Sequence, residues 1–336
     1  MNLSYFDILD LASSGLEASG LDPHASFETA QFLALAEMDG LSSHGLTRVA
    51  QYASHAKNGR IELYASPSVK HYKTAAALVD ACDGLAFPAI KNATDLSVKL
   101  GFKNGIGIVA IKNSHHFGVA GHYVEAAARA GYISLLFGNT PAAMPMAGGK
   151  KALFGTNPLA CAFPVSGKDP LVIDMSLSAV ARGKLLVAAK SGASIPLGWA
   201  LTADGIPTTD PQAGLQGLMV PFGGDKGALL ALLVELLVVG LSGSQFSYEA
   251  DSFFDVKGNR PRIGQLIITI DPGLAGKSIY QTKLQQFLNE LSSDEGIRLP
   301  GERRFQKRAQ SLLDGVQVPD QIVNEIQSGI RSSWAL

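Results

Sequence analysis

The chain has 336 residues, of which 46% are hydrophobic and 17% charged, so it can bury a large core in one or two domains. Its formal net charge of −1 excludes the basic surface of a typical nucleic-acid-binding protein, and its most apolar run, residues 227–241, is too short to cross a membrane. Acidic residues near the N-terminus disfavour a signal peptide, and Cys82 and Cys161 lack metal or redox spacing, so we expect a cytoplasmic protein.

The first sixty residues have the apolar spacing that is typical of helices. One predicted helix is capped by Ser4, the next includes residues 32–38, and a third runs from the segment SSHG at 42–45 to about Lys57. Strands and helices then alternate, which places a sheet in the middle of the chain. In chain order these elements are strands at 61–66 and 69–82, a helix at 89–102, a strand at 106–111, a helix at 123–130, strands at 132–139, 152–164 and 170–176, helices at 179–191 and 225–241, a strand at 264–271 and a helix at 278–291.

The C-terminal end returns to helix, because two polar helices follow the segment RLPGERR at 298–304. The helical ends and the strand-rich middle predict an α/β (α+β) protein in which a helical domain wraps around a sheet domain. We place the helical domain at residues 1–60 plus 290–336 and the sheet domain at 61–289, with a helical insertion around 209–245. Because the helix at 225–241 is almost entirely apolar, we expect it to be buried.

The segment SSHGLTR at 42–48 combines an acid with a cation. His44 and Arg48 stand four residues apart, so on a helix they share one face. A 2-oxo or 2-imino acid needs both groups: an arginine fork for its carboxylate, and an acid for the oxygen or nitrogen that gains charge on reduction. The alternative is a surface helix capped by Ser42 or Ser43, with Arg48 in solvent.

Phosphate-binding segments must be sought outside the common motifs. No G-x-G-x-x-G follows a predicted strand and opens a helix, so neither a Rossmann site nor a P-loop is expected. PFGGDKG at 221–227 places a glycine turn and Lys226 at a helix start, where free N–H groups favour an anion; the alternative is an ordinary glycine turn. RLPGERR supplies three arginines around a Pro-Gly turn, and the alternative there is a solvated charge cluster.

Three histidines stand close together at His115, His116 and His122. Their spacing matches no familiar zinc pattern, so no metal is expected. The HHFG segment follows a strand and precedes a helix, which is typical of a ligand-facing loop. Asp174 and the pair Thr156-Asn157 lie at similar strand ends, where open sheets gather ligand contacts.

Taken together, these motifs resemble the second type of malate/L-lactate dehydrogenase. This is a non-Rossmann NAD(P)-dependent family that includes ureidoglycolate, sulfolactate and diketogulonate enzymes and the Δ1-piperideine-2-carboxylate/Δ1-pyrroline-2-carboxylate reductases. The stretches that carry the resemblance run in family order across nearly the whole chain: SHGLTR, SHHFGVAGHY, GTNPLACAFP, IDMSLSAVARGK, PTTDP, PFGGDKG and RLPGERR. In the C-terminal half, LSGSQFSYEAD and GQLIITIDP look most like the cyclic-imine reductases. The resemblance implies a mixed, largely antiparallel sheet and a homodimer with its active site near the interface.

The resemblance also implies roles for particular residues. It makes His44 the proton donor, supported by Ser43, Arg48 the clamp for the substrate carboxylate, and Thr156 a substrate contact. Lys184 stands where a Δ1-piperideine-2-carboxylate reductase has an acidic relay partner, so its catalytic role here is substrate electrostatics or a different relay. The residues that match cofactor-binding stretches are His116, Phe117, Gly118, Val119, Ala120, Asp174, Met175, Ser176, Asp225, Lys226, Arg298, Leu299, Pro300, Gly301, Glu302, Arg303 and Arg304.

These residues lead to an expected function. We expect NADPH-dependent reduction of a small cyclic 2-imino acid, Δ1-pyrroline-2-carboxylate or Δ1-piperideine-2-carboxylate, to L-proline or L-pipecolate. Arg303, Arg304 and Lys226 favour NADP(H) over NAD(H), whereas Asp225 replaces a residue that is basic in some relatives and loosens contact with a cofactor phosphate. Two alternatives are a dehydrogenase of a 2-hydroxy acid such as malate, lactate or ureidoglycolate, and a non-catalytic sensor that only binds a nucleotide.

Overall fold

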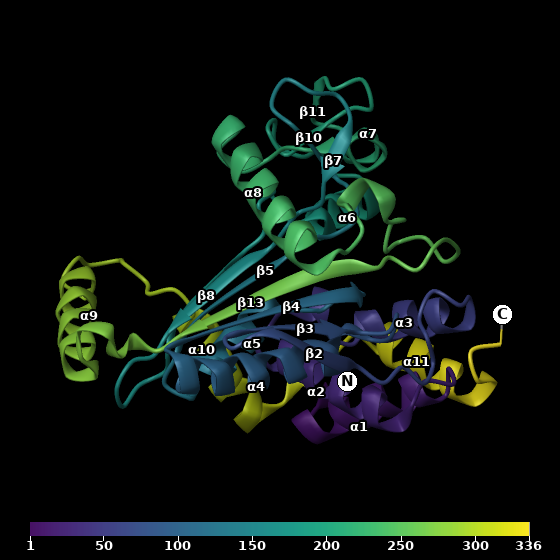
Figure 1. Cartoon of the computed structure of the whole chain (residues 1–336). Helices are drawn as coiled ribbons and strands as arrows, with labels where there is room; N and C mark the ends of the chain where they lie inside the picture. The colour runs from purple at the N-terminus through teal and green to yellow at the C-terminus, as the bar shows by residue number, and fades with distance from the viewer. Residues whose placement is uncertain (336) are drawn as a thin grey trace.

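A seven-stranded sheet forms the centre of the computed structural model, which describes residues 1–335 (Figure 1). Its strand order is β2-β3-β4-β13-β5-β8-β9; β3 and β4 run parallel, and every other neighbouring pair is antiparallel. The predicted mixed, largely antiparallel sheet is therefore confirmed. The strands are β2 (Ser68–Lys73), β3 (Ala76–Asp80), β4 (Ile106–Ser114), β5 (Ile133–Gly138), β8 (Leu159–Phe163), β9 (Leu171–Met175) and β13 (Ile263–Ile270).

The late strand β13 lies in the middle of this sheet, between β4 and β5. Leu266 is opposite Ala110 of β4 and Phe137 of β5. Its nearly uninterrupted apolar sequence suits a strand that is covered on both faces. The first residue of β13, Ile263, pairs with Ser114 at the end of β4. The segment before β13 therefore arrives beside the HHFG loop that follows β4.

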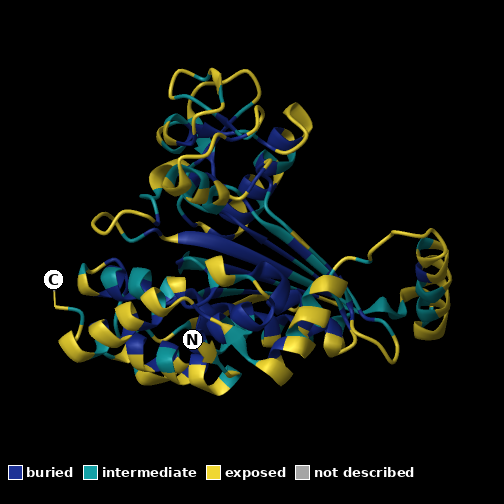
Figure 2. Cartoon of the chain, turned by 180° about the vertical axis from the view of Figure 1, so that it is seen from behind, coloured by how far each residue is buried: buried dark blue, intermediate teal, exposed yellow. Residues whose placement is uncertain are grey.

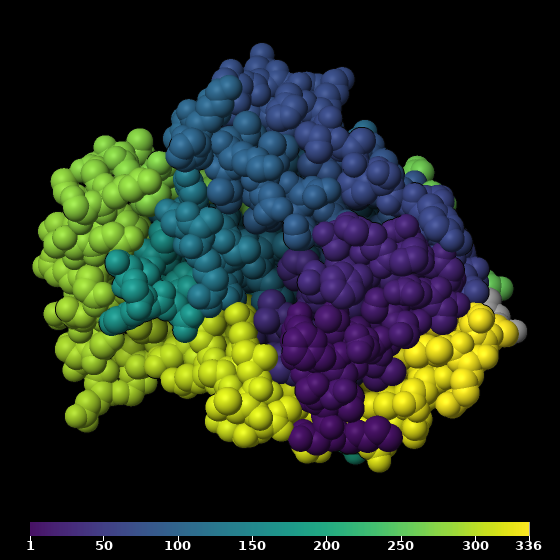
Figure 3. Space-filling view, turned by 90° about the horizontal axis from the view of Figure 1, so that it is seen from below, coloured from purple at the N-terminus to yellow at the C-terminus, as the bar shows by residue number. Residues whose placement is uncertain are grey.

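Helices from both ends of the chain, together with two that lie between the strands in sequence, cover one side of the sheet (Figure 1). They are α1 (Tyr5–Glu17), α2 (Pro23–Met38), α3 (Thr47–Lys57), α4 (Ala86–Asn104), α5 (Ala120–Arg129), α10 (Glu302–Asp314) and α11 (Asp320–Ser332). The two ends lie side by side (Figure 3): β1 (Asn2–Leu3) pairs with β14 (Val316–Gln317), and Trp334 Nε1 donates to the Gly15 carbonyl at 2.7 Å. One apolar core includes Leu33 of α2 and Ile267 of β13. These helices thus share a core with the sheet, and the domain boundaries at residues 60 and 290 stay a prediction.

A smaller layer covers the other side of the sheet (Figure 1). A second apolar cluster joins Val234 and Val238 of its longest helix to Leu266 of β13. Its elements are β6 (Met144–Pro145), β7 (Ala152–Phe154), α6 (Arg182–Ser191), β10 (Ala200–Leu201), β11 (Pro207–Thr208), α7 (Pro211–Gln216), β12 (Leu218–Met219) and α8 (Asp225–Ser242). The helix α9 (Lys277–Ser292) projects from the body, with much of its surface exposed (Figure 2). No helix within residues 1–335 has the length and apolarity needed to span a bilayer.

The prediction of a single helix from residue 42 to Lys57 is wrong. A short 3-10 helix, η1 (Ser42–His44), comes first, and α3 begins only at Thr47. The carboxylate of Glu37 explains the break, because it accepts the Leu46 N–H at 2.7 Å and lies where a side chain at Gly45 would otherwise be. His44 and Arg48 are therefore not on one continuous helix, and neither Ser42 nor Ser43 caps α3.

Two further expectations are corrected. Residues 61–66 form no strand; instead the Leu63 carbonyl accepts the Asp22 N–H at the start of α2, which takes this segment away from the sheet edge. The helix at 225–241 is buried on one face only. Leu229, Leu233 and Leu236 are 54%, 49% and 56% exposed, because no part of residues 1–335 covers the face of α8 that points away from the sheet.

Candidate active site

His44 lies in η1 and is held by two neighbours. Its Nδ1 is 3.0 Å from Ser43 Oγ and shares a hydrogen bond with it. Its ring stacks on that of His116, with 5.7 Å between the ring centres and 23° between the planes. The structure thus brings the adjacent pair Ser43 and His44 together with the HHFG loop, which lies more than 70 residues later in the chain.

Arg48 is tied to the same group from the first turn of α3. Its Nε donates to the Ser43 carbonyl at 2.7 Å, and its Nη1 donates to Gln51 Oε1 at 2.6 Å. The remaining N–H groups of the guanidinium have no acceptor among the described residues. The clamp and the proton carrier are therefore joined through the backbone of Ser43 rather than by a shared helix face.

Tyr52 and Phe253 complete the surroundings of His116. The buried Tyr52 hydroxyl lies 2.5 Å from His116 Nδ1, and burial raises the pKa of Tyr52, so the hydroxyl keeps its proton and can donate it. Phe253 packs edge-on against the His116 ring at 5.4 Å and 83°. Sequence reasoning missed these residues and Gln51. Gln51 and Tyr52 follow Arg48 by three and four positions, so the helical face that carries Arg48 predicts them. Nothing in the sequence around Phe253 indicates that it contacts this site.

The electrostatics of the site keep both stacked rings neutral near pH 7. Burial, and then the charge of Arg48, lower the pKa of His44 to about 4. Burial also holds the pKa of His116 well below its ordinary value. Without a bound anion His44 is therefore a proton acceptor. An anion beside Arg48 would offset the charge of Arg48 and so remove the second cause of the low pKa of His44.

A second group of predicted residues meets at the start of α5. Asp174, in β9, accepts the Gly121 N–H at 2.8 Å, and Arg304 Nη1 lies 3.6 Å from the same oxygen. Burial raises the pKa of Asp174, although Arg304 opposes this. A Cβ at Gly121 would lie 2.5 Å from Arg304 Nη1 and 2.6 Å from Asp174 Oδ2, so a larger residue there would displace one of these side chains. The Arg304 side chain is 10% exposed, and its Nε has no hydrogen-bond partner among the described residues.

The glycine turn before α8 lies beside the end of β9. The Phe222 N–H donates to the Leu177 carbonyl at 2.9 Å, which brings the turn next to Met175 and Ser176. Gly223 and Gly224 have φ angles of +61° and +65°, and no side chain caps the first N–H groups of α8. Asp225 and Lys226 are exposed there. The arrangement offers free amide donors and a cation to a phosphate.

The RLPGERR segment runs alongside β9. The Pro300 carbonyl accepts the Val172 N–H at 3.3 Å, and Gly301 turns the chain into α10 with a φ angle of +92°. Arg298 and Arg303 are exposed. Leu299, Pro300 and Glu302 line a cavity of about 480 Å³ between α9 and α10. Of the segment's arginines, Arg304 is the one that the structure joins to Asp174.

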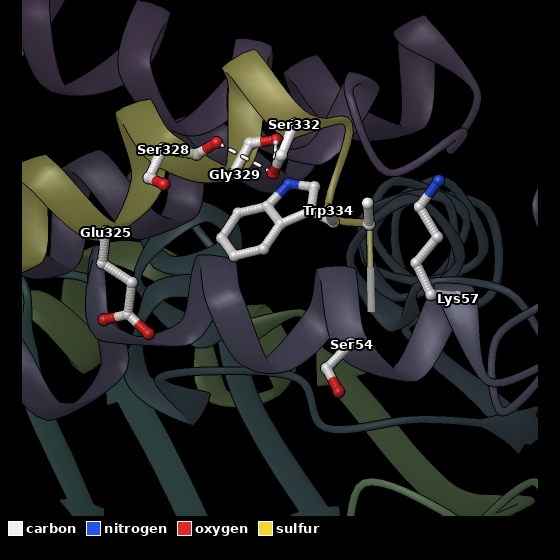
Figure 4. A pocket seen from close by; sticks show the side chains of 8 residues that line it. Ser54, Lys57, Glu325, Ser328, Gly329, Ser332 and Trp334 are labelled. Carbon is white, nitrogen blue, oxygen red and sulfur yellow. Dashed lines mark hydrogen bonds between the residues drawn. The ribbon is translucent and has the colours of Figure 1, made fainter.

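Lys184 and Thr156 form no hydrogen bond with the group around His44 among the described residues. Lys184 is exposed in the first turn of α6, with its ammonium 5.6 Å from the centre of the Trp199 ring. Thr156 Oγ1 lies 3.4 Å from Thr140 Oγ1, and the two hydroxyls share a hydrogen bond. No contact among the described residues joins either of them to His44. Another cavity, of about 290 Å³, lies between α3 and α11 around Trp334 (Figure 4) and contains no predicted site residue.

Within residues 1–335, no group of three or more His, Cys, Asp or Glu side chains is arranged to hold a metal ion. Two groups carry the predicted chemistry of the site: the histidine and arginine pair around Ser43, and the donors around Asp174, Arg304 and the glycine turn. The first can bind a small carboxylate and exchange a proton with a neighbouring oxygen or nitrogen of the same molecule, and the second can bind phosphates.

Comparison with known proteins identifies the family of the chain. The family model of malate/L-lactate dehydrogenase matches residues 3–327. A (2R)-3-sulfolactate dehydrogenase (NADP(+)) of Chromohalobacter salexigens is 45% identical over 95% of both chains. A Δ1-pyrroline-2-carboxylate/Δ1-piperideine-2-carboxylate reductase of Pseudomonas syringae pv. tomato is 35% identical over 97% of this chain and 95% of its own. The crystal structure of the Δ1-piperideine-2-carboxylate reductase from the same organism superimposes with a TM-score of 0.92 and 34% identity, covering 98% of this chain and 99% of its own. The chain therefore belongs to the malate/L-lactate dehydrogenase family.

Proposed function

We propose that the protein is an NADP-dependent oxidoreductase that acts at C2 of a small carboxylic acid. The observation that carries the proposal is the group formed by Ser43, His44 and Arg48. In it a proton-carrying ring and a two-point carboxylate clamp are joined by hydrogen bonds of 3.0 Å and 2.7 Å to one serine. A protein that only senses a nucleotide would not need this pair.

The nucleotide is assigned to the edge formed by Asp174, Arg304 and the glycine turn before α8. The residues there fit it: Arg304 offers a nearly buried cation whose Nε lies 3.7 Å from Asp39 Oδ2 but has no hydrogen-bond partner among the described residues, and α8 offers uncapped N–H groups. The relative from Chromohalobacter salexigens carries NADP(+) in its name, which supports NADP over NAD. When bound, NADPH supplies the hydride for the reduction.

His44 handles the proton of the reaction. Its low pKa leaves the ring neutral near pH 7, so in the oxidation direction it can take the proton of a 2-hydroxyl. A substrate carboxylate on Arg48 removes one cause of that low pKa. Substrate binding therefore raises the pKa of His44 and favours the protonated ring that reduction requires. Ser43 bonds Nδ1 and leaves Nε2 for the substrate.

Two substrate classes fit, and we propose a 2-hydroxy acid with a second anionic group as the first. Arg182, in the first turn of α6, lies 5.4 Å over the ring of Phe254, which is the residue after the Phe253 that contacts His116. This second cation suits a second acidic group, and the relative named for 3-sulfolactate has the higher identity of the two relatives compared, 45% against 35%. The cyclic 2-imino acid expected from the sequence is the second candidate. The apolar face of Phe253 suits its ring, and the reductase structure covers 98% of the chain.

A substrate panel tests the proposal. Rates of NADPH and NADH oxidation would be measured with 3-sulfopyruvate, oxaloacetate, pyruvate, Δ1-pyrroline-2-carboxylate and Δ1-piperideine-2-carboxylate. We expect kcat/KM for 3-sulfopyruvate to exceed that for pyruvate by at least about tenfold, and Arg182→Met to reduce this ratio while leaving pyruvate nearly unaffected. An imine preferred by about tenfold or more would establish the second candidate. Absence of turnover with all five substrates and both nucleotides would overturn the function.

We also propose a homodimer. Leu229, Leu233 and Leu236 form an exposed apolar stripe on α8, and a second copy of the chain would bury it. Light scattering after gel filtration should give a dimer, and Leu233→Glu should yield monomers. A wild-type monomer at micromolar concentration would contradict this part of the proposal.

A further inference from the structure

The loop at residues 251–259 closes into a ring around one buried side chain. The Asp251 carboxylate accepts the Asn259 N–H at 2.6 Å and so joins the two ends of the loop. Gly258 permits the closure, because its φ angle is +145° and a Cβ there would lie 2.6 Å from Asp251 Oδ2. The side chain inside the ring is that of Arg60, which is 0% exposed.

The guanidinium of Arg60 is bound by the backbone of this ring. Its Nε donates to the Asn259 carbonyl at 3.1 Å, its Nη1 to the Ser252 carbonyl at 3.0 Å, and its Nη2 to the Asp251 carbonyl at 3.3 Å. The Asp255 carbonyl also accepts from Nη1. No carboxylate within the described residues forms an ion pair with Arg60. A planar fork with five donors matches several carbonyls at once, which the single nitrogen of a lysine cannot do.

Through Phe253, the ring touches both the stacked histidines and the carboxylate clamp. The Phe253 side chain packs against the His116 ring, which stacks on His44. The Phe253 carbonyl accepts from Gln51 Nε2 at 2.5 Å, and Gln51 in turn accepts from Arg48. One residue of the ring therefore sets the position of the stacked histidines and of the carboxylate clamp.

A second line of contacts joins Arg60 to the HHFG loop. His55 Nδ1 lies 3.0 Å from His115 Nε2, and His55 Nε2 lies 3.2 Å from Arg60 Nη1 and 3.1 Å from the Asp255 carbonyl. The His115 ring packs on Phe253 at 5.3 Å. His55 thus links the guanidinium of Arg60 to His115, the first residue of the HHFG loop.

We propose that Arg60 is a positioning residue for the reaction. By filling the ring at 251–259 it holds Phe253 against His116 and Gln51, and through them it sets the geometry of His44 and Arg48. The inference rests on the proposed function of that pair. Displacements on the order of 1 Å at such groups reduce rates by about a hundredfold.

The first test is independent of catalysis. Lys257 is exposed in the ring, so trypsin cleavage after it reports whether the ring is closed. Arg60→Met should accelerate this cleavage at least about tenfold, and Arg60→Lys should give an intermediate rate. Arg262→Met is the matched control, because Arg262 lies just beyond the ring and binds Asp83 at the surface; it should change the rate less than about twofold. A ring that stays resistant in Arg60→Met would overturn the inference.

The second test separates KM from kcat. We expect Arg60→Met to raise the KM of the carboxylate substrate through Gln51 and Arg48 and to lower kcat through His116, with kcat/KM reduced about ten- to a hundredfold. NADPH affinity, measured by fluorescence titration, should change less than about twofold, and Arg60→Lys should recover part of the loss. Should Arg60→Met fail to fold, Phe253→Ala removes the contact with His116 but keeps Arg60 and the backbone carbonyl that Gln51 binds, so kcat should fall while KM changes little; an unchanged kcat would overturn the inference.

The outcomes distinguish this inference from the proposed function. A looser ring with unchanged kcat and KM would overturn the role of Arg60 while the function stands. A wild-type protein that is inactive on the whole panel would overturn the function and the kinetic part of the inference, whereas faster cleavage at Lys257 in Arg60→Met would still support the role of Arg60 in closing the ring.

Discussion

Replacement of Arg48 by lysine keeps the charge of the carboxylate clamp and removes its shape. Two of the five N–H groups of Arg48 are engaged by protein, one by the Ser43 carbonyl and one by Gln51. Three remain, and a carboxylate can take two of them in parallel. A lysine has three donors on one nitrogen, so it cannot serve Ser43, Gln51 and both oxygens of a substrate together.

The size of the effect follows from these hydrogen bonds. A hydrogen bond to a charged group contributes about 1.5–3 kcal/mol, and tenfold in affinity corresponds to about 1.4 kcal/mol. Loss of one of the two bonds to the substrate should therefore lower kcat/KM about ten- to 150-fold, mainly through KM. Loss of the bond to Ser43 adds a smaller decrease in kcat, because that residue orients His44.

The assay is steady-state kinetics at saturating NADPH with the best substrate of the panel. NADPH affinity of Arg48→Lys, followed by fluorescence titration, should equal that of the wild type within about twofold. Arg129→Lys is the matched control, since Arg129, the last residue of α5, binds Glu125 of the same helix and Asp169 before β9 rather than any residue of η1; its kcat/KM should not change. A decrease below about threefold in Arg48→Lys would refute the reasoning that Arg48 binds the substrate at two points.

Three further predictions follow from other parts of the structure. His44→Asn should keep NADPH affinity but lower kcat at least about a hundredfold, and a kcat near the wild-type value would remove His44 from the mechanism. Arg304→Met should weaken NADPH about ten- to a hundredfold and NADH little, as titration with each nucleotide would show; equal losses would assign Arg304 to the pyrophosphate. Burial tends to raise the pKa values of Asp39 and Glu125, but hydrogen bonds from Arg308 hold them below their ordinary values. Their contribution to stability is thus present above pH of about 4 and lost as the pH falls through the folded-state values. Melting temperatures should therefore fall less steeply with acid in Arg308→Met than in the wild type, and parallel curves would contradict this.

Local sequence predicted the features that depend on neighbouring residues. The continuous apolar runs of β4, β5 and β13 identify central strands, because a strand covered on both faces needs no alternation. The segment SSHGLTR indicated a proton carrier and a clamp because Ser43, His44 and Arg48 lie within six residues, and the chain itself keeps them close. Turns at the end of β9 and before α8 were found for the same reason.

The same local reasoning failed where a distant group decides the conformation. The helix predicted from residue 42 breaks because the Glu37 carboxylate of α2 binds the Leu46 N–H and occupies the space beside Gly45. The apolar pattern of α8 predicts burial but not which face the sheet covers, so the exposed leucine stripe became visible only in the fold.

Tertiary structure alone brought the ring at 251–259 to the active site. Arg60 and Asn259 are 199 residues apart, and Gln51 and Phe253 are 202 apart, yet each pair is hydrogen-bonded. The cause is the position of β13 beside β4, which pairs Ile263 with Ser114 and so delivers the preceding loop to the HHFG segment. The order of strands in a sheet depends on how all the apolar faces can be buried together, and no window of the sequence contains that information.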